Sequence, residues 1–394
     1  MSDLAVRFTE RPTRDGCRIG VAMLNSPKSL NALSLEMIGQ LEARFDDWAA
    51  DPGIVAIWLE GAGDKAFCAG GDVVALYRSL IESRDTSDAN RSAAFAKSQF
   101  AESSFAESYF AAEYRLDYRI HTFSKPILVW GDGIVMGGGL GLLAGGFQRL
   151  VTETTRIAMP EITIGLYPDI GASWFLGRMP SGVGAYLGLT GAQLNARDAL
   201  DLGLADRFIP RERREALLDA LAAADYGDRT QSELRAAVQE VLDDQEDRRD
   251  MPPAQVWPHL DHLQALVGRV DAATAVRRIL DDRSEDRWLA ANRARLEAGC
   301  PLSAHLVWRM LERHAHSSLA DAFRDELSLS VQCGRLGDFA EGVRALLVEK
   351  DKAPRWSHVD VASVPEADIE ALLAPLWSET THPLRDIDQA PFAG

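Results

Sequence analysis

Cysteine is scarce in this sequence, and its spacing excludes the sites that cysteine most often builds. The four cysteines stand far apart in a chain of 394 residues and form no CxxC pair. A disulfide framework needs a denser set, and a thiolate zinc site needs paired ligands. The eight histidines are scattered too and do not gather at zinc-ligand spacing. We therefore expect reduced thiols, as in a cytosol, and no metal site.

Long apolar runs are missing as well. No segment reaches the ~20 consecutive apolar residues of a membrane-spanning helix. Residues 1–16 lack the apolar stretch of a secretory signal, and their Asp3 and Glu10 are unlike the Arg-rich, acid-poor composition of a transit peptide. These absences predict a cytoplasmic protein with no membrane partner.

Positive charge is in deficit, because the formal net charge is −17. A nucleic acid or an anionic membrane needs a basic surface, so neither is expected as a partner. A small anionic ligand held by a local basic patch is still allowed. Phosphate-binding motifs are missing too, since the glycine-rich segment 61–72 is followed by neither GKS nor GKT and does not fit GxGxxG.

The sequence does contain the pattern of an α/β domain. Arg18–Leu24 mixes apolar and β-branched residues and ends at an Asn-Ser-Pro turn, which indicates a strand. Ser34 then caps a helix with apolar residues at three- and four-residue spacing, and residues 54–60 follow as a second strand. A strand–helix–strand unit of this kind is expected to form a right-handed crossover. With 46% hydrophobic residues, the chain can bury a full core.

Two glycine-rich stretches offer backbone N–H groups to a ligand. Gly70 and Gly71 precede a helix that we expect to begin near Asp72, with Asp72 as its cap. A triple glycine at 137–139 follows a strand at 127–130 and opens a small-residue helical run. Glycine lacks a Cβ, and the first N–H groups of a helix are free, so each stretch is a candidate donor to a developing alkoxide. The alternative is that these glycines only permit tight packing or a turn.

Glu161 and Asp169 stand close behind the second stretch, each directly after a proline. Proline fixes its own φ, so both carboxylates have little freedom. Preorganised acids beside free N–H groups suit chemistry on a carbonyl carbon. The alternative for each acid is a structural role at a helix N-terminus, where the dipole favours negative charge.

The remaining segments predict a helical second half. Residues 79–104 are expected to include a loop, and 105–120 an amphipathic helix whose aromatic residues pack in the core. Asn195 and Asp198 indicate another helix start. Beyond Pro210 the chain is rich in Ala, Leu, Arg and Glu, and helical in period. We therefore expect two parts, a catalytic core at 1–210 and a helical C-terminal region at 211–394.

Three motifs together resemble the crotonase superfamily of acyl-CoA enzymes: AFCAGGD (66–72), MGGGLG (136–141) and MPEITIGLYPDIG (159–171). YPDIG and the later DFAEGVRALLVEKDKAPRW (338–356) resemble its 3-hydroxyisobutyryl-CoA hydrolase branch. The matches extend over most of the chain. The resemblance implies an α/β fold, a crotonase-like spiral of ββα units, with a helical C-terminal region.

The resemblance also implies where acyl-CoA binds. The adenine would lie near residues 65–67, and the thioester at the two glycine loops. The N–H groups of Gly71 and Gly138 would form the oxyanion hole that binds the thioester oxygen. Further substrate-binding residues are expected around them: Lys65, Ala66, Phe67, Ala69, Asp72 and Gly139.

Glu161 and Asp169 are then the expected catalytic residues. The hydratases of the superfamily carry a glutamate where this chain has Gly141, and usually a glycine where it has Asp169. Because hydration needs paired carboxylates, the loss of one argues against it. We expect hydrolysis of a short branched 3-hydroxyacyl-CoA, most simply 3-hydroxyisobutyryl-CoA in valine catabolism. Glu161 would be nucleophile or general base, and Asp169 would orient the substrate or water, or protonate the leaving thiolate.

Two other functions stay open at this point. One is an enoyl-CoA hydratase or isomerase that uses Glu161 alone, and the other is a non-catalytic acyl-CoA-binding protein. Coenzyme A is part of the substrate, so no cofactor is expected. Members of the superfamily often form trimers or their dimers, which makes a homo-oligomer possible, although the helical region could cover the surface used for assembly.

Overall fold

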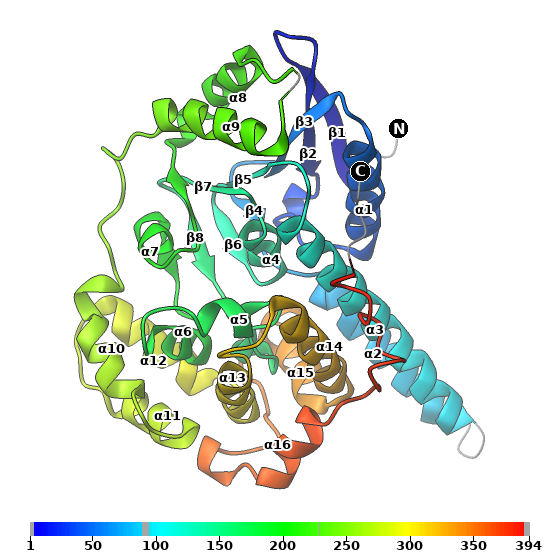
Figure 1. Cartoon of the computed structure of the whole chain (residues 1–394). Coiled ribbons are helices and arrows are strands. Elements are labelled where there is room, and N and C mark those ends of the chain that lie inside the picture. The colour runs from blue at the N-terminus through cyan, green and yellow to red at the C-terminus, as the bar shows by residue number, and fades with distance from the viewer. Residues whose placement is uncertain (1–3, 89–93, 228, 390–394) are drawn as a thin grey trace.

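Two sheets of different size organise the chain (Figure 1). The structure is a computed structural model and describes residues 4–88, 94–227 and 229–389. β1 is antiparallel to β2, and the other neighbours in the larger sheet are parallel. The larger sheet has six strands in the order β1-β2-β3-β5-β7-β10: β1 (Val6–Pro12), β2 (Arg18–Leu24), β3 (Ile54–Gly61), β5 (Ile127–Gly131), β7 (Gln148–Val151) and β10 (Arg207–Phe208).

The middle of this sheet is buried on both faces. Ile57 and Leu59 of β3 belong to the same core as α1 (Leu35–Ala50), whereas Trp58 packs in a second core with α8 (Arg214–Ala223) and α9 (Gln231–Gln245). A strand covered on both faces is a continuous apolar run, which is why the sequence predicts it. β1 is not predicted because, as an edge strand, it is mostly exposed or half-buried.

The smaller sheet brings three loops together. Its strands are β4 (Ala66–Cys68), β6 (Ile134–Met136), β8 (Arg156–Ala158) and β9 (Leu194–Asn195), in that order. β4, β6 and β8 are parallel, so their carboxyl ends lie at one edge. The segments that leave this edge are residues 69–72, 137–139 and 159–161, which include both predicted glycine turns and the first predicted acid. Ligands commonly bind at such an edge of an α/β sheet.

Two long helices flank this edge, α2 (Val73–Asp88) and α3 (Ala94–His121), and Figure 1 shows them projecting as a pair. Asp72 caps α2 as predicted, since its Oδ1 accepts from Ala75 N at 3.0 Å. The loop predicted before residue 104 is wrong for the described residues, because α2 extends to Asp88 and α3 begins at Ala94, while residues 89–93 lie outside the described part of the chain. Ala, Glu, Lys and Gln are strong helix formers, and this propensity outweighs the weak apolar period there.

The other helices before residue 210 are α4 (Gly138–Ala144), α5 (Ala172–Leu176), α6 (Val183–Thr190) and α7 (Ala196–Asp201). α7 begins at the predicted Asn195–Asp198 capping box. The described residues beyond 210 form helices without strands, as predicted: α8, α9, α10 (Leu260–Val267), α11 (Ala272–Asp281), α12 (Arg287–Ala298), α13 (Pro301–Arg313), α14 (Leu319–Arg335), α15 (Gly337–Val343) and α16 (Glu366–Leu373).

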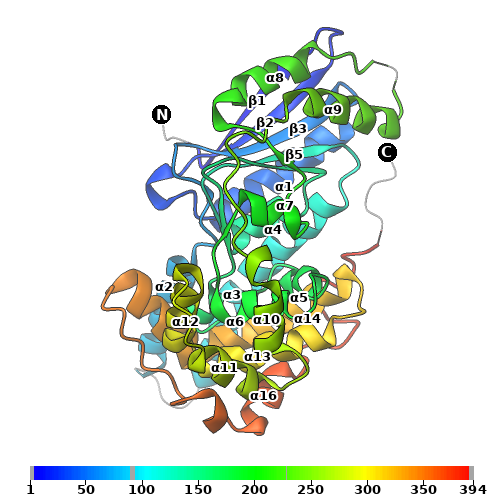
Figure 2. The ribbon, with the colours of Figure 1, turned by 90° about the vertical axis from the view of Figure 1, so that its left-hand side faces the viewer.

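The helical region divides between the two ends of the molecule. Figure 2 shows α8 and α9 against the larger sheet and α10 to α16 gathered at the opposite end. One core cluster joins residues from both sides of position 210, for example Leu166 and Phe323 of α14. The boundary at 210 stays a prediction. None of the described helices is long and apolar enough to cross a bilayer.

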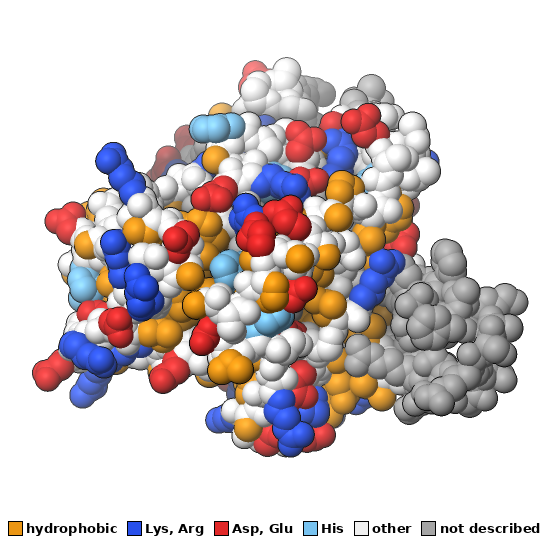
Figure 3. Space-filling model, turned by 90° about the horizontal axis from the view of Figure 1, so that it is seen from below, with side chains coloured by type: hydrophobic (Ala, Val, Ile, Leu, Met, Phe, Trp, Pro, Cys, Tyr) orange, Lys and Arg blue, Asp and Glu red, His pale blue; other side chains and the backbone are white. Residues whose placement is uncertain are grey.

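The surface of the helical end carries charges of both signs. Figure 3 shows acidic and basic side chains interspersed there, with hydrophobic side chains between them. The chain's net negative charge is therefore not concentrated on this face as a single acidic patch.

Removing Arg214 should destabilise the fold strongly. Arg214 Nε donates to Glu60 Oε2 at 2.6 Å, and the Glu60 side chain is 2% exposed. Arg214→Met leaves that carboxylate buried without its cation, which costs about 3–5 kcal/mol in comparable sites. Urea unfolding measures the loss, and the Glu60→Gln/Arg214→Met double variant should recover much of it. A single variant as stable as the parent would contradict this account.

Candidate active site

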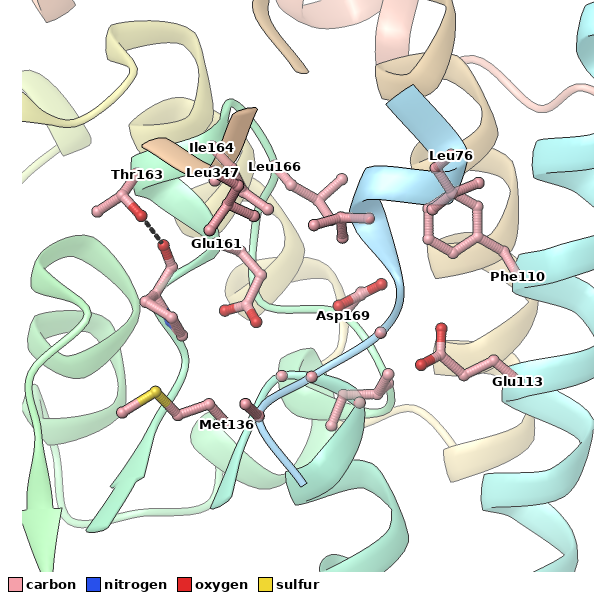
Figure 4. Close-up of a pocket in the computed structure, with 18 of the residues that line it drawn as sticks. Leu76, Phe110, Glu113, Met136, Glu161, Thr163, Ile164, Leu166, Asp169 and Leu347 are labelled. Atoms are coloured by element: carbon pink, nitrogen blue, oxygen red, sulfur yellow. Dashed lines mark hydrogen bonds between the residues drawn. The ribbon is translucent and has the colours of Figure 1, made fainter. Parts of the chain in front are cut away.

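A cavity lies at the carboxyl edge of the smaller sheet and contains both predicted acids. Its empty volume is about 870 Å³, which includes space open to solvent at the mouth. Figure 4 shows the carboxyl groups of Glu161, Asp169 and Glu113 within it. The wall is otherwise largely apolar and includes Leu76, Phe110, Met136, Ile164, Leu166, Ile170, Leu346 and Leu347.

Glu161 begins the 3-10 helix η2 (Glu161–Ile164), directly after Pro160. The residue is 5% exposed, and its Oε2 has no hydrogen-bond partner among the described residues. A Cβ at Gly137 would lie 2.9 Å from Glu161 Oε1. Gly137 also has φ +47°, so this position needs glycine both for its conformation and for the approach of the carboxylate.

Asp169 lies in the loop between η2 and α5 and is buried. Tyr114 of α3 donates a hydrogen bond from its hydroxyl to Asp169 Oδ2 at 2.6 Å. Burial raises the pKa of Asp169 to about 6, and the Tyr114 bond opposes that rise. The next residue, Ile170, has φ +57°, a strained conformation for a β-branched side chain.

Glu113 is a cavity residue that the sequence analysis missed. It lies on α3 and is buried, and its Oε1 has no hydrogen-bond partner among the described residues. A Cβ at Gly138 would collide with that oxygen. The sequence did contain a sign of it, because Glu113 stands among Tyr109, Phe110 and Tyr114 on a helix face that was expected to pack in the core. An acid on such a face needs a partner or a function.

Asp117 lies one turn further along α3 and is fully buried, with neither carboxyl oxygen hydrogen-bonded among the described residues. A Cβ at Gly141 would lie 2.6 Å from Asp117 Oδ2. The carboxyl of Asp117 thus occupies the space beside the position where hydratases were expected to carry glutamate. It does not line the cavity.

Burial dominates the electrostatics of this cluster. It raises the pKa values of Glu161, Glu113 and Asp117 well above that of an ordinary carboxyl, and the negative charge of Asp169 raises all three further. Asp169 differs because the Tyr114 hydroxyl and its own backbone N–H stabilise its ionised form.

The predicted N–H pair is close together. A Cβ at Gly138 would lie 3.3 Å from Gly71 N, and neither Gly71 N–H nor Gly138 N–H donates to another described residue. Tyr109 holds the first of these turns: its hydroxyl accepts from Asp72 N at 3.1 Å and donates to Leu33 O at 2.7 Å. Gly71 and Gly138 are thus neighbours at the cavity wall, and the N–H of each lacks an acceptor among the described residues.

The other predicted substrate-binding residues divide into two groups. Ala69 lines the cavity together with Gly71 and Gly138, whereas Lys65, Ala66, Phe67, Asp72 and Gly139 do not. Ala66 and Phe67 line a second pocket with Arg211 and Arg214. The glycine at 139 allows close packing, because a Cβ there would collide with the backbone oxygen of Cys68. Roles for these residues in CoA binding stay predictions.

Among the described residues, no group of three or more His, Cys, Asp or Glu side chains is arranged to hold a metal ion. Cys68, Cys300 and Cys333 are buried thiols that form no disulfide.

Comparison with known proteins matches these features to a family. A family model described as enoyl-CoA hydratase/isomerase matches residues 19–373. The chain belongs to this family. Solved structures similar to this chain include an enoyl-CoA hydratase from Rhodobacter sphaeroides, with a TM-score of 0.76, 29% identity and coverage of 94% of this chain and 97% of the other. A carnitinyl-CoA dehydratase from Mycobacterium thermoresistibile has a TM-score of 0.77, 30% identity and coverage of 94% and 96%. The predicted crotonase-like fold is confirmed.

Within the enoyl-CoA hydratase/isomerase family, relatives of similar length carry a hydrolase name. A chicken (Gallus gallus) protein named 3-hydroxyisobutyryl-CoA hydrolase, mitochondrial, is 35% identical over 91% of this chain and 86% of its own. An Arabidopsis thaliana protein named 3-hydroxyisobutyryl-CoA hydrolase 1 is 33% identical over 86% and 84%. The predicted resemblance to that branch is confirmed.

Asp117→Asn should flatten the pH dependence of stability. The pKa of Asp117 is raised in the folded state, so above the ordinary carboxyl pKa the unfolded chain binds fewer protons than the folded one. Stability therefore falls as pH rises, and the neutral amide removes that contribution. The difference in Tm, variant minus parent, should be larger at about pH 8.5 than at about pH 5. The exposed Asp244→Asn is the control, and equal differences at both pH values would contradict the prediction.

Proposed function

We propose that the protein hydrolyses a short, branched 3-hydroxyacyl-CoA thioester, most simply 3-hydroxyisobutyryl-CoA to 3-hydroxyisobutyrate and CoA. The observation that carries the proposal is the meeting of Glu161 with the free N–H groups of Gly71 and Gly138 in one cavity. The names of the relatives support the same substrate.

The glycine pair would stabilise the charge that develops on the thioester oxygen. As the carbonyl carbon becomes tetrahedral, its oxygen gains negative charge, and two preorganised N–H donors stabilise that charge more than they stabilise the substrate. Removing one such donor costs roughly 3–4 kcal/mol in comparable enzymes. Tyr109 keeps the Gly71 turn in place, because it holds both Leu33 and Asp72.

Glu161 would supply the attacking oxygen by one of two routes. As general base it takes a proton from water, the water oxygen bonds to the acyl carbon, and the carbon–sulfur bond breaks. As nucleophile its carboxylate bonds to the acyl carbon and expels the thiolate, and water then hydrolyses the mixed anhydride. Either route consumes one water and releases the acid and CoA thiol, and in both Glu161 must first be ionised.

The walls fit a small acyl group that carries a hydroxyl. Leu76, Phe110 and Leu166 offer apolar surface to the branched carbon skeleton. Glu113 and Asp169 offer buried carboxyl oxygens, of which Glu113 Oε1 has no hydrogen-bond partner among the described residues. A substrate hydroxyl would satisfy one of these groups, and an analogue without it would leave the group unpaired, which disfavours binding.

Enoyl-CoA hydration is a second candidate because of Glu113. The glutamate missing at Gly141 argued against hydration, but Glu113 places another carboxyl in the cavity with Glu161. Two carboxyls are what the addition of water to an enoyl group needs. Asp169 favours the hydrolase, because hydratases of the superfamily are expected to have a glycine at this loop position.

No resident cofactor is part of this proposal, since CoA enters as part of the substrate. Homo-oligomer formation and a cytoplasmic location stay predictions, and the mitochondrial names of several relatives point to another compartment for those proteins.

Free thiol is the product that distinguishes the candidates. Incubation with 3-hydroxyisobutyryl-CoA and a thiol reagent should show release of CoA thiol. With crotonyl-CoA, a hydratase would instead remove the enone absorbance without releasing thiol. If that is the only reaction observed, the proposed hydrolase function is wrong. Tight binding of acyl-CoA without any turnover would favour the non-catalytic alternative.

Glu161→Gln should reduce kcat by at least about 100-fold while leaving acyl-CoA affinity nearly unchanged, because the amide keeps the shape but cannot accept a proton or attack. Steady-state kinetics and equilibrium binding measure the two effects. The exposed Glu297→Gln is the matched control. Unchanged turnover in Glu161→Gln would remove this residue from the mechanism.

The pH–rate profile should report the environment of Glu161. Its pKa is raised, so kcat/KM should fall on acidification at a pH above that of an ordinary glutamate. Asp169→Asn removes a negative charge that raises this pKa, so the acid limb should move to lower pH in the variant, whatever its residual rate. A limb that stays in place or moves upward would be inconsistent with ionised Glu161 as the active form.

A further inference from the structure

Asp169 is joined to the helical region by a chain of buried hydroxyls. Tyr114 OH lies 2.6 Å from Asp169 Oδ2 and 2.7 Å from Ser330 Oγ on α14. Ser330 Oγ lies 3.0 Å from Tyr167 OH, which donates to the backbone oxygen of Glu326 at 2.8 Å. Each of these hydroxyls is buried, so water does not compete for the bonds.

The loop around Asp169 is also held from α14 on its other side. The carboxylate of Glu326 accepts from Gly171 N at 2.6 Å and from Ser173 N at 3.1 Å. Between these anchors and Tyr167, Ile170 has φ +57° and Asp169 lines the cavity. α14 therefore fixes both the backbone that carries Asp169 and the partner of its carboxyl.

Which hydroxyl donates and which accepts depends on whether Asp169 is ionised or protonated. When Asp169 is ionised, Tyr114 must donate to it, so Ser330 donates to Tyr114. When Asp169 carries a proton, it can donate to Tyr114 O, after which Tyr114 donates to Ser330 and Ser330 to Tyr167. The Tyr167 hydroxyl donates to the Glu326 carbonyl oxygen in both cases. Every hydroxyl hydrogen therefore has an acceptor in both states.

We infer that Tyr114 and Ser330 are positioning residues that let Asp169 gain and lose a proton in place, by reversing the direction of their hydrogen bonds. The inference rests on the proposed function to the extent that Asp169 serves the thioester reaction. It assigns Asp169 a role as acid as well as acceptor: its proton can pass to the leaving thiolate, after which Tyr114 again donates to the carboxylate.

The groups that face Asp169 constrain how this can be tested. They are all acidic: Glu113 and Asp117 on α3, Glu161 on η2, Glu326 on α14, and the phenols of Tyr114 and Tyr167. Variants that remove only a hydroxyl leave all of these carboxyls in place. A change in the titration of Asp169 can then be traced to the chain of hydroxyls.

Two hydroxyl deletions should shift the pKa of Asp169 in opposite directions. Tyr114→Phe removes the donor to the carboxylate, and charge-assisted bonds are the stronger ones, so the pKa should rise by about half a pH unit or more. Ser330→Ala keeps the bond from Tyr114 to the carboxylate in the ionised state and removes only the donor to Tyr114 O there. In the protonated state it leaves the buried Tyr114 O–H without an acceptor, which costs more, so the pKa should fall. Carbon-13 NMR of the labelled carboxyl in the full chain measures both shifts without turnover.

Steady-state kinetics provides the second readout. Both variants should lower kcat more than they raise KM, because the acyl pocket is unchanged. Tyr186→Phe, which deletes a buried hydroxyl bonded to Asn292 elsewhere, should leave the titration of Asp169 unmoved. Shifts in the same direction, or none, would overturn the inference. If Tyr114→Phe does not fold, a rise or no change in Ser330→Ala overturns it. If the parent releases no CoA thiol, the proposed function fails, while the NMR titration still decides the hydroxyl chain.

Discussion

The site depends on close contact between carboxyl oxygens and glycine backbone. Glu161 approaches Gly137, Glu113 approaches Gly138, and Asp117 approaches Gly141, each so closely that an added Cβ would force the carboxyl group to move. These contacts bring acids out of water, and burial is the largest cause of their raised pKa values. Gly138 has two effects at once, because its N–H has no acceptor among the described residues and its missing Cβ lets Glu113 be buried beside it. Gly137 and Gly141 have only the second effect, since their N–H groups donate to Ala158 O and Gly137 O.

The sequence predicts those parts of the site that lie in one stretch of chain. The two glycine turns, Glu161 and Asp169 are recognisable because glycine and proline fix the local backbone, and the structure places all of them around one cavity. The paired central strands are recognisable for a related reason, since a strand buried on both faces is apolar throughout. The site roles themselves still await the experiments.

Contacts between distant segments could not be predicted. Glu113 and Asp117 lie on a helix expected to be ordinary core, and only the packing of α3 against α4 shows what they touch. The start of α3 was missed because helix propensity there prevails without an apolar period. Nothing local to Ser330 indicates that it contacts Tyr114, which is 216 residues away. The C-terminal region is thus part of the site, although its sequence shows only helices.

α3 reaches the site through side chains spaced four residues apart: Tyr109 at the first glycine turn, Glu113 in the cavity and Asp117 beneath α4. On an α-helix such residues share one face, and each residue turns about 100° from the last. A single deletion or insertion between Tyr109 and Asp117 would rotate one part of the face away from the other. The number of residues between Tyr109 and Asp117 is therefore fixed by the three separate places that this part of the helix contacts.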